Sequence, residues 1–167
     1  NGIGPCTYFS AQEVAYENME GWSPSNSGNK DEAYLNYSME KALSNSVNTV
    51  AVKVLEKTGI PNVIQQAKKM GIETPLPALP SLALGTAEIK INELAGAYAS
   101  FLNNGKSVTL FLIQQITNEK DSIIEVFKPV VAIKRAFSEE TRQIMFEMMK
   151  ATVNSGTAAR IRSTYGI

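Results

Sequence analysis

Two small polar residues, Ser46 and Asn48, lie in the stretch of this sequence that is best suited to chemistry. Apolar and helix-forming residues flank them on both sides, so the sequence predicts that their side chains project together from a bend between two helical segments. A serine hydroxyl can relay a proton, and an asparagine amide can donate a hydrogen bond to a carbonyl group. By composition alone a structural role is favoured, because serine and asparagine are also preferred N-caps of a following helix. A cap and a site can coexist at one position.

The chemistry open to the chain is narrowed by the residue types that it lacks. Histidine is absent from all 167 residues, which excludes Ser-His-Asp and Cys-His catalysis and imidazole metal ligands. Cys6 is the only cysteine, so neither an internal disulfide nor a paired-cysteine metal site can form. No cofactor is expected, since the sequence has neither a dinucleotide-type glycine pattern nor a Walker-type phosphate loop. A proton relay would therefore use serine, lysine, tyrosine or carboxylate groups.

Composition and length indicate one globular domain. Hydrophobic residues make up 44% of the chain and charged residues 19%, which favours a buried core over disorder. Lys plus Arg number 16 and Asp plus Glu number 16, so the net charge of +0 disfavours nucleic acid as a partner. No apolar run approaches the ~18 residues that are typical of a membrane span, so we expect no such span in this chain.

The elements that position Ser46 and Asn48 are predicted to be mainly helical. The predicted helices are a turn capped by Ser38 that runs through Leu43, a helix that begins near Val47 and ends at Gly59, a helix opened by Pro61 and ended by Gly71, a helix with Leu94, Ala97, Tyr98, Phe101 and Leu102 on its inner face, and a helix that follows Ser138 to about Asn154. On the second of these helices, Lys53, Glu56 and Lys57 are expected to face the solvent.

A minor β part accompanies the helices. Residues 1–31 are rich in glycine, proline, serine and asparagine and are typical of a loop, with room for a short strand between Tyr8 and Tyr16. Residues 108–116 and 122–127 are β-branched and apolar, and the turn-like residues 118–121 between them predict a β-hairpin. The expected fold class is α+β and predominantly helical.

Short motifs occur in a particular order along the chain. They are Trp22-x-Pro24-x-Asn26, the segment Ala42-Leu43-Ser44-Asn45-Ser46-Val47-Asn48-Thr49-Val50-Ala51, Leu84-Gly85, Ala97-Tyr98-Ala99-x-Phe101 with Asn104-Gly105, and Val153-x-Ser155-Gly156-Thr157. Together they resemble the landmarks of the transpeptidase domain of penicillin-binding proteins, most like the bifunctional class that also polymerises glycan. The resemblance covers nearly the whole chain. It departs at Lys106 and Ala158, where the family usually has glycine, and at Thr109, where proline is frequent.

The resemblance implies the helical part of a serine β-lactamase-like or transpeptidase-like domain with a small β-hairpin. Such domains bring together a Ser-x-x-Lys nucleophile, a Ser-x-Asn element and a Lys-Thr-Gly strand. Only the second of these, Ser46-Val47-Asn48, is expected in residues 1–167, which would then be a partial domain truncated at both ends. The nucleophile helix should lie just before Asn1 and the Lys-Thr-Gly strand just after Ile167, so the isolated chain is predicted to be inactive.

For function, the resemblance implies a parent D,D-transpeptidase that cross-links peptidoglycan stem peptides by serine acyl transfer and binds penicillin. In that scheme Ser46 and Asn48 are the catalytic residues of this chain. Ser46 would relay a proton toward the leaving amine, and Asn48 would hydrogen bond the peptide carbonyl of the substrate. The implied partners are stem peptides and β-lactams. The implied location of the parent is the periplasmic or extracytoplasmic side of the bacterial cytoplasmic membrane.

Two other kinds of function remain open at the level of sequence. One is a non-catalytic helical module that binds a peptide or a protein, and the other is a β-lactamase or β-lactam sensor fragment of the same superfamily. Ser46-Val47-Asn48 has no aspartate at its middle position, which favours a transpeptidase over a β-lactamase.

Further matches to the family's motifs are rejected on geometric grounds. Lys57-Thr58-Gly59 begins nine residues beyond Asn48, about 13 Å along a helix at ~1.5 Å per residue, whereas a proton relay needs about 3 Å. Ser38-Met39-Glu40-Lys41 is interpreted as a helix cap, and Ser27-Gly28-Asn29-Lys30 as part of a loop. We therefore expect Ser46 and Asn48 to share one exposed side, with Lys57 turned elsewhere.

Overall fold

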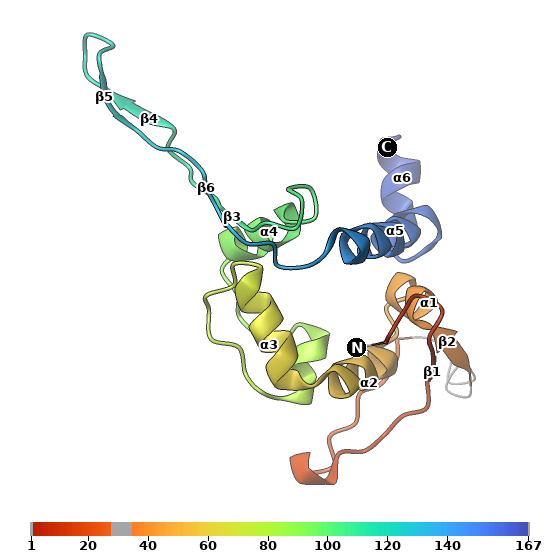
Figure 1. Ribbon diagram of the computed structural model, residues 1–167. Coiled ribbons are helices and arrows are strands. Elements are labelled where there is room, and N and C mark those ends of the chain that lie inside the picture. Colours follow the sequence, from red (N-terminus) through yellow and green to blue (C-terminus); the bar gives the residue numbers. More distant parts are fainter. Residues whose placement is uncertain (1, 28–34, 167) are drawn as a thin grey trace. The chain divides into compact units, whose positions relative to one another are not determined.

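A computed structural model describes residues 2–27 and 35–166 of the chain (Figure 1). Its helices and strands follow in the order β1 (Tyr8–Ser10), η1 (Glu17–Met19), β2 (Asn36–Ser38), α1 (Met39–Ser44), α2 (Asn48–Thr58), α3 (Ile60–Lys69), η3 (Pro80–Leu84), α4 (Ile91–Ala99), β3 (Val108–Thr109), β4 (Gln115–Thr117), β5 (Ile123–Val126), β6 (Val130–Val131), α5 (Glu139–Ser155) and α6 (Ala159–Tyr165). The two η elements are short 3₁₀ helices. Helix predominates and the strands are short, which confirms the predicted α+β class.

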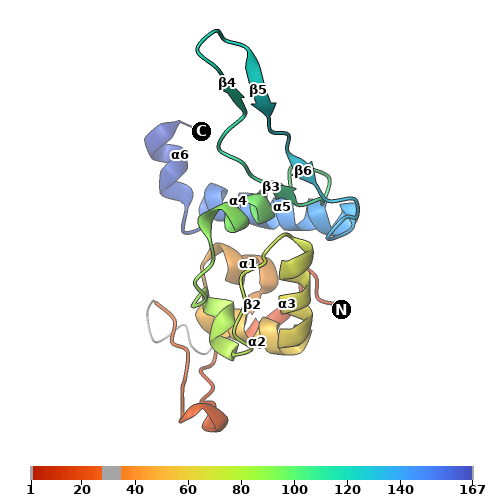
Figure 2. The ribbon, with the colours of Figure 1, turned by 90° about the vertical axis from the view of Figure 1, so that its left-hand side faces the viewer.

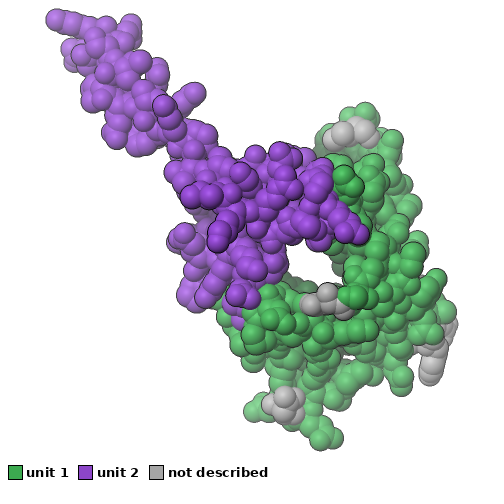
Figure 3. Space-filling model, viewed as in Figure 1, with its two compact units in different colours: residues 1–63, 76–87, 143–167 green, residues 64–75, 88–142 purple. Residues whose placement is uncertain are grey.

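The chain folds into two compact units (Figure 3). Unit 1 comprises Asn1–Val63, Leu76–Ala87 and Gln143–Ile167, and unit 2 comprises Ile64–Pro75 and Glu88–Arg142. Each unit is therefore assembled from segments that are separated in sequence. The assignment of residues 1–167 to one partial domain stays a prediction.

The core of unit 1 lies where α1 and α2 pack against the sheet of β1 and β2. The two strands are antiparallel, with Phe9 opposite Tyr37. Buried residues of the core are Ala11, Tyr37, Ala42, Val47 and Val50, with Phe9 and Val54 packed against them. Residues 47, 50 and 54 fall on one face of a helix with 3.6 residues per turn, so the apolar spacing seen in the sequence is what buries α2.

The boundaries of α2 and α3 agree closely with the predicted ones. Gly59 ends α2 with a φ of +89°, a conformation that suits glycine because it has no Cβ, and its N–H group donates to the carbonyls of Leu55 and Glu56. The next helix, α3, begins at Ile60 and has Pro61 in its first turn. Proline is tolerated there because N–H groups in the first turn make no hydrogen bond within the helix. The short strand expected between residues 8 and 16 is also present, as β1.

In unit 2 the predicted β-hairpin is present, but it is divided into two short paired regions (Figure 2). Strand β4 pairs with β5, and β3 pairs with β6, in both cases antiparallel. The side chain of Asn118 closes the turn by accepting hydrogen bonds from the N–H groups of Lys120 and Ser122. The expected continuous strand over residues 108–116 is therefore wrong in its middle, where residues 110–114 belong to no strand.

The inner face predicted for α4 is confirmed at Ala97 but wrong at its larger side chains. Gly96, Ala97 and Ser100 are buried, whereas Tyr98 is 60% exposed and Leu102 is 77% exposed. The cause is a close approach between α4 and β3, because a Cβ atom on Gly96 would lie only 2.5 Å from the carbonyl oxygen of Val108. Small residues permit this approach, and the face that carries them turns inward in place of the larger side chains.

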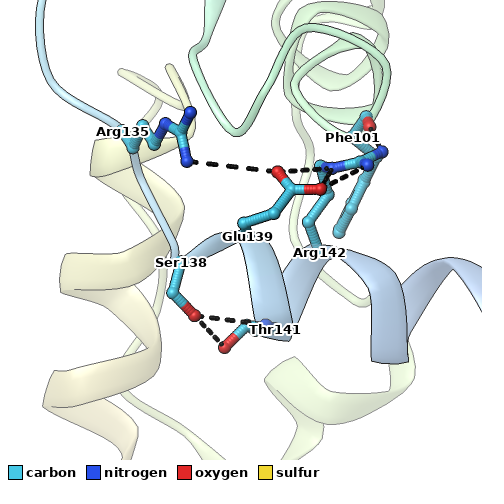
Figure 4. A network of polar contacts seen from close by, with 6 residues as sticks. All are labelled: Phe101, Arg135, Ser138, Glu139, Thr141 and Arg142. Atoms are coloured by element: carbon cyan, nitrogen blue, oxygen red, sulfur yellow. Dashed lines mark hydrogen bonds and ion pairs between the residues drawn. The ribbon is translucent and has the colours of Figure 1, made fainter.

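The start of α5 is fixed by a polar network within unit 2 (Figure 4). Ser138 caps the helix, because its Oγ accepts the N–H group of Thr141 at 3.1 Å. Glu139 accepts hydrogen bonds from Nε of Arg142, and Nη1 of the same arginine donates to the carbonyl of Phe101 at 3.0 Å. The bond to Glu139 raises the pKa of the Arg142 guanidinium above its ordinary value. The helix predicted after residue 138 is confirmed, whereas α6, which follows the turn at residues 156–158, was not predicted.

Candidate functional site

Ser46 lies in an exposed turn between α1 and α2, as the sequence predicts. Its φ of +56° is left-handed, which is uncommon for a residue other than glycine. The N–H group of Ser46 donates to the carbonyl of Leu43 at 3.2 Å, and that of Val47 donates to the carbonyl of Ala42 at 2.9 Å. These two bonds form a Schellman motif that ends α1, with Ser46 at the position that glycine usually occupies.

Neither Ser46 nor Asn48 caps α2, so the expected structural role is wrong. The N-cap residue is Val47, whose side chain makes no cap hydrogen bond, and Asn48 is already the first residue of the helix. A serine N-cap takes an extended backbone so that its oxygen can reach the first turn, whereas Ser46 is held in a left-handed conformation by the end of α1. The Ser46 hydroxyl consequently does not cap α2.

The side chain of Asn48 is half-buried beside a loop of unit 1. Its Nδ2 atom donates to the carbonyl oxygen of Ser25 at 2.8 Å. A side-chain amide carries two N–H groups, so this bond orients the amide and leaves one N–H group for a ligand. The structure thus places the two residues that the sequence singles out at the junction of α1 and α2.

A cavity of about 500 Å³ opens beside this turn within unit 1. Ser46 and Asn48 are among its lining residues, and most of the others are apolar side chains from α1, α2, η3 and α5. Met145 and Met148 of α5 belong to this lining, and Met148 is almost fully buried. The arrangement places a hydroxyl and an amide at a mostly apolar wall, where a ligand would be shielded from water and polar contacts would be few.

The rejected motif matches have structural roles elsewhere. Ser38 is the N-cap of α1, and its Oγ accepts the N–H group of Lys41 at 3.2 Å, as expected. Lys57 lies in the last turn of α2, and its Nζ is 5.5 Å from the centroid of the Phe9 ring in a cation–π contact. The match that begins at Ser27 falls mostly on residues 28–30, which lie outside the described residues.

Lys53 makes a structural contact that the sequence does not predict, because helical spacing assigns it to the solvent side of α2. Its Nζ donates to the carbonyl oxygens of Ser10 at 2.8 Å and Gln12 at 2.6 Å, so it ties the end of β1 to α2. Burial lowers the pKa of Lys53 below its ordinary value. Helical spacing alone carries no signal for such a contact, since the partner carbonyls lie about 40 residues away in sequence.

A second link between the N-terminal loop and α2 joins Tyr16 to Glu56. The phenol of Tyr16 donates to Oε2 of Glu56 at 3.0 Å. Burial, together with this bond, raises the pKa of Tyr16 to about 12. The centroid of the Trp22 ring lies 5.5 Å from that of the Tyr16 ring, so these two aromatic side chains pack against each other within the loop.

Residues 2–27 and 35–166 contain no group of three or more histidine, cysteine, aspartate or glutamate side chains that could hold a metal ion. Among the same residues, no helix combines the length and the apolar character needed to cross a membrane.

Sequence comparison matches the chain to penicillin-binding proteins. A family model described as the penicillin binding protein transpeptidase domain matches residues 3–166. Penicillin-binding protein 1A of Aquifex aeolicus (strain VF5) is 34% identical over 141 residues, which cover 84% of this chain and 19% of that protein. Penicillin-binding protein 1A of Neisseria lactamica is 30% identical over 141 residues, which cover 82% of this chain and 17% of that protein. The chain thus spans about a fifth of the length of these relatives.

Solved structures share the fold at lower sequence identity. The crystal structure of penicillin-binding protein 1A from Haemophilus influenzae matches with a TM-score of 0.85 at 19% identity, over 98% of this chain and 30% of that one. Penicillin-binding protein A from M. tuberculosis, as an imipenem acyl-enzyme complex, matches with a TM-score of 0.76 at 17% identity, over 92% of this chain and 40% of that one. Because the family model covers nearly the whole sequence, the chain belongs to the family of penicillin-binding protein transpeptidase domains.

Proposed function

We propose that this chain supplies the Ser-x-Asn element of a serine-type D,D-transpeptidase that cross-links peptidoglycan stem peptides and is acylated by β-lactams. The observation that carries the proposal is the left-handed, exposed Ser46 beside Asn48, on the wall of an apolar cavity. A non-glycine residue in this conformation costs on the order of 1–3 kcal/mol, and such strain is concentrated at functional sites. Family membership supports the assignment of this strained turn to that function.

In the proposed reaction, a serine outside this chain attacks the carbonyl carbon of the terminal D-Ala-D-Ala bond and forms an acyl-enzyme. The Ser46 hydroxyl passes a proton toward the departing D-Ala amine, so the amine leaves in neutral form. The free N–H group of Asn48 donates to a peptide carbonyl of the substrate and orients the bond that breaks. The amine of a second stem peptide then displaces the serine, which completes the cross-link.

The nucleophile is assigned to another part of the parent protein because the Ser-x-x-Lys match within the described residues, which begins at Ser38, is a helix cap. It follows that the isolated chain should not form an acyl-enzyme. We place the reaction on the extracytoplasmic side of the bacterial membrane, where stem peptides are found, and name stem peptides and β-lactams as the partners.

The proposal is tested by the acylation of the full-length protein with a fluorescent penicillin. Ser46→Ala should slow acylation by on the order of 10² to 10⁴, which is the range for the loss of a positioned acid or base. Ser38→Ala is the matched control, since it removes a serine hydroxyl that only caps a helix and should cost about 1 kcal/mol of stability with no change in rate. Stable labelling of the isolated chain, or a slow Ser38→Ala with a normal Ser46→Ala, would contradict the assignment. A wild-type protein without label would favour a non-catalytic binding module.

A further inference from the structure

The N-terminus of α2 is capped by a side chain from a distant part of unit 1. The N-cap residue, Val47, makes no side-chain hydrogen bond to the helix. The N–H group of Thr49, in the first turn, instead donates to Oδ1 of Asn26 at 3.0 Å. An N–H group at this position has no partner within its own helix, so Asn26 supplies the acceptor that the local sequence lacks.

A second hydrogen bond between the same two residues determines which side chain can occupy position 26. Nδ2 of Asn26 donates to Oγ1 of Thr49 at 3.1 Å, and that hydroxyl donates to the carbonyl of Ala11 at 3.0 Å. Thr49 is 1% exposed and its hydroxyl has one hydrogen, so it can only accept from residue 26. An amide offers both the acceptor and the donor. Aspartate would keep the acceptor but would bring a second acceptor against the Thr49 oxygen.

The loop that carries Asn26 also holds the catalytic turn. The carbonyl oxygen of Ser25 accepts the hydrogen bond from Nδ2 of Asn48. Ser25 and Asn26 of the loop therefore hydrogen bond to Asn48 and Thr49 at the start of α2. On the other side of the turn, the Schellman motif of α1 fixes the backbone of Ser46. The turn that contains Ser46 is thus held at one end by the carbonyls of α1 and at the other end by the loop of Ser25 and Asn26.

We infer that Asn26 is a positioning residue for the Asn48 amide, an inference that rests on the function proposed above. Asn26 acts through Thr49 and through the backbone of Ser25, and it does not contact the reacting atoms. Its loss releases the loop from the first turn of α2, so the Asn48 amide loses its fixed direction. Because a displacement of 1 Å at a catalytic group can cost on the order of 100-fold in rate, a measurable kinetic effect should follow.

The test compares acylation of the full-length protein by a fluorescent penicillin in Asn26→Ala and Asn26→Asp. The rate constant at saturating penicillin reports the alignment of the site, whereas the labelled fraction reports how much protein is folded. We expect the rate constant to fall by roughly 10- to 100-fold in both variants. Asn62→Ala is the matched control, because Asn62 hydrogen bonds to the carbonyl of Thr58 at the opposite end of α2, and its rate constant should equal that of the wild type.

A double variant separates positioning from stability. If Asn26 acts through the Asn48 amide, adding Asn26→Ala to Asn48→Ala should slow acylation much less than Asn26→Ala does alone. A wild-type rate constant in Asn26→Ala, with only a smaller labelled fraction, would mean that Asn26 merely stabilises the fold, and this would overturn the inference. If Asn26→Ala does not fold, Asn26→Asp decides by the same comparison, since aspartate retains the cap acceptor.

Failure of the proposed function would give a different pattern. A wild-type protein that takes no label, or a Ser46→Ala variant with the wild-type rate, would overturn the proposed function and the positioning role with it. A labelled wild type and a slow Ser46→Ala, combined with wild-type rates in both Asn26 variants, would overturn the positioning role alone.

Discussion

The backbone of Gly156 lies directly against the carbonyl group of Ser44, two residues before Ser46. The next residue, Thr157, donates its N–H group to the same carbonyl oxygen at 2.9 Å. The last carbonyl groups of a helix have no N–H partner within that helix. The turn that follows α5 thus provides a donor for a carbonyl at the end of α1. This contact explains why a glycine occupies the Ser155-Gly156-Thr157 motif, since any Cβ atom there would overlap the Ser44 carbonyl.

Gly156→Ala is therefore expected to destabilise the protein. The added Cβ would meet backbone atoms of both Ser44 and Thr152, and overpacking of this kind typically costs about 1–3 kcal/mol. Urea unfolding of the full-length protein measures the loss. Gly4→Ala is the control, because no atom lies within 4 Å of the position that its Cβ would take. Equal stability of the two variants would mean that the turn can move away from α1 without cost.

Two substitutions at Ser46 should separate strain from chemistry. Ser46→Gly and Ser46→Ala both remove the hydroxyl, so acylation should be slowed to the same extent in both variants. Glycine adopts the φ of +56° freely, whereas alanine retains a strain of roughly 1–2 kcal/mol. The greater freedom of glycine in the unfolded chain offsets about 0.5–1 kcal/mol of that difference. Ser46→Gly should thus be more stable than Ser46→Ala by up to about 1.5 kcal/mol in thermal unfolding, and the reverse order would contradict a strained turn.

The position of Ser46 could be predicted because it depends on local sequence. Apolar spacing before and after residues 44–48 defines two helices, and their junction must be a bend. The role of Ser46 within the bend could not be predicted in the same way. Serine is common as an N-cap and rare in a left-handed conformation, so composition favours the cap that the structure does not show.

Contacts between distant segments account for the other differences. Asn26 and Lys53 each bond to groups that are 23 or more residues away, and helix periodicity records only which face of a helix is apolar. The inner face of α4 was misassigned for a related reason. Large apolar side chains predict burial on average, but the close approach of Gly96 to β3 decides which face is buried.

Glu93 should make unit 2 sensitive to acid. The N–H groups of Thr74 and Glu73 donate to its Oε2 at 2.9 and 3.1 Å. These bonds lower the pKa of the Glu93 carboxyl below its ordinary value of 4.5, and the bond from Thr74 has the larger effect. A carboxyl with a lowered pKa in the folded state contributes stability that is complete above its ordinary pKa and is lost as the pH falls through the folded-state value.

Hydrogen exchange of a peptide that contains Thr74 measures this effect, after correction for the intrinsic pH dependence of exchange. In the wild type, protection should decrease as the pH falls below 4.5, whereas in Glu93→Gln it should be weaker and nearly independent of pH over the same range. Glu119→Gln, in the turn of the hairpin, is the matched control and should behave like the wild type. A wild-type pH profile in Glu93→Gln would assign the acid sensitivity to another group.

Lys53→Met should destabilise unit 1 although the sequence suggests a solvent-facing lysine. The substitution keeps most of the apolar length of the side chain but removes the hydrogen bonds to the carbonyls of Ser10 and Gln12. Hydrogen bonds to a charged donor contribute about 1.5–3 kcal/mol each when buried, and these are partly exposed, so we expect a loss of about 1–2 kcal/mol in urea unfolding. Lys57→Met is the matched control on the same helix, where a cation–π contact with Phe9 is worth about 0.5–1 kcal/mol. If Lys57→Met were the more destabilising of the two, β1 would be held to α2 chiefly by its apolar packing and not by Lys53.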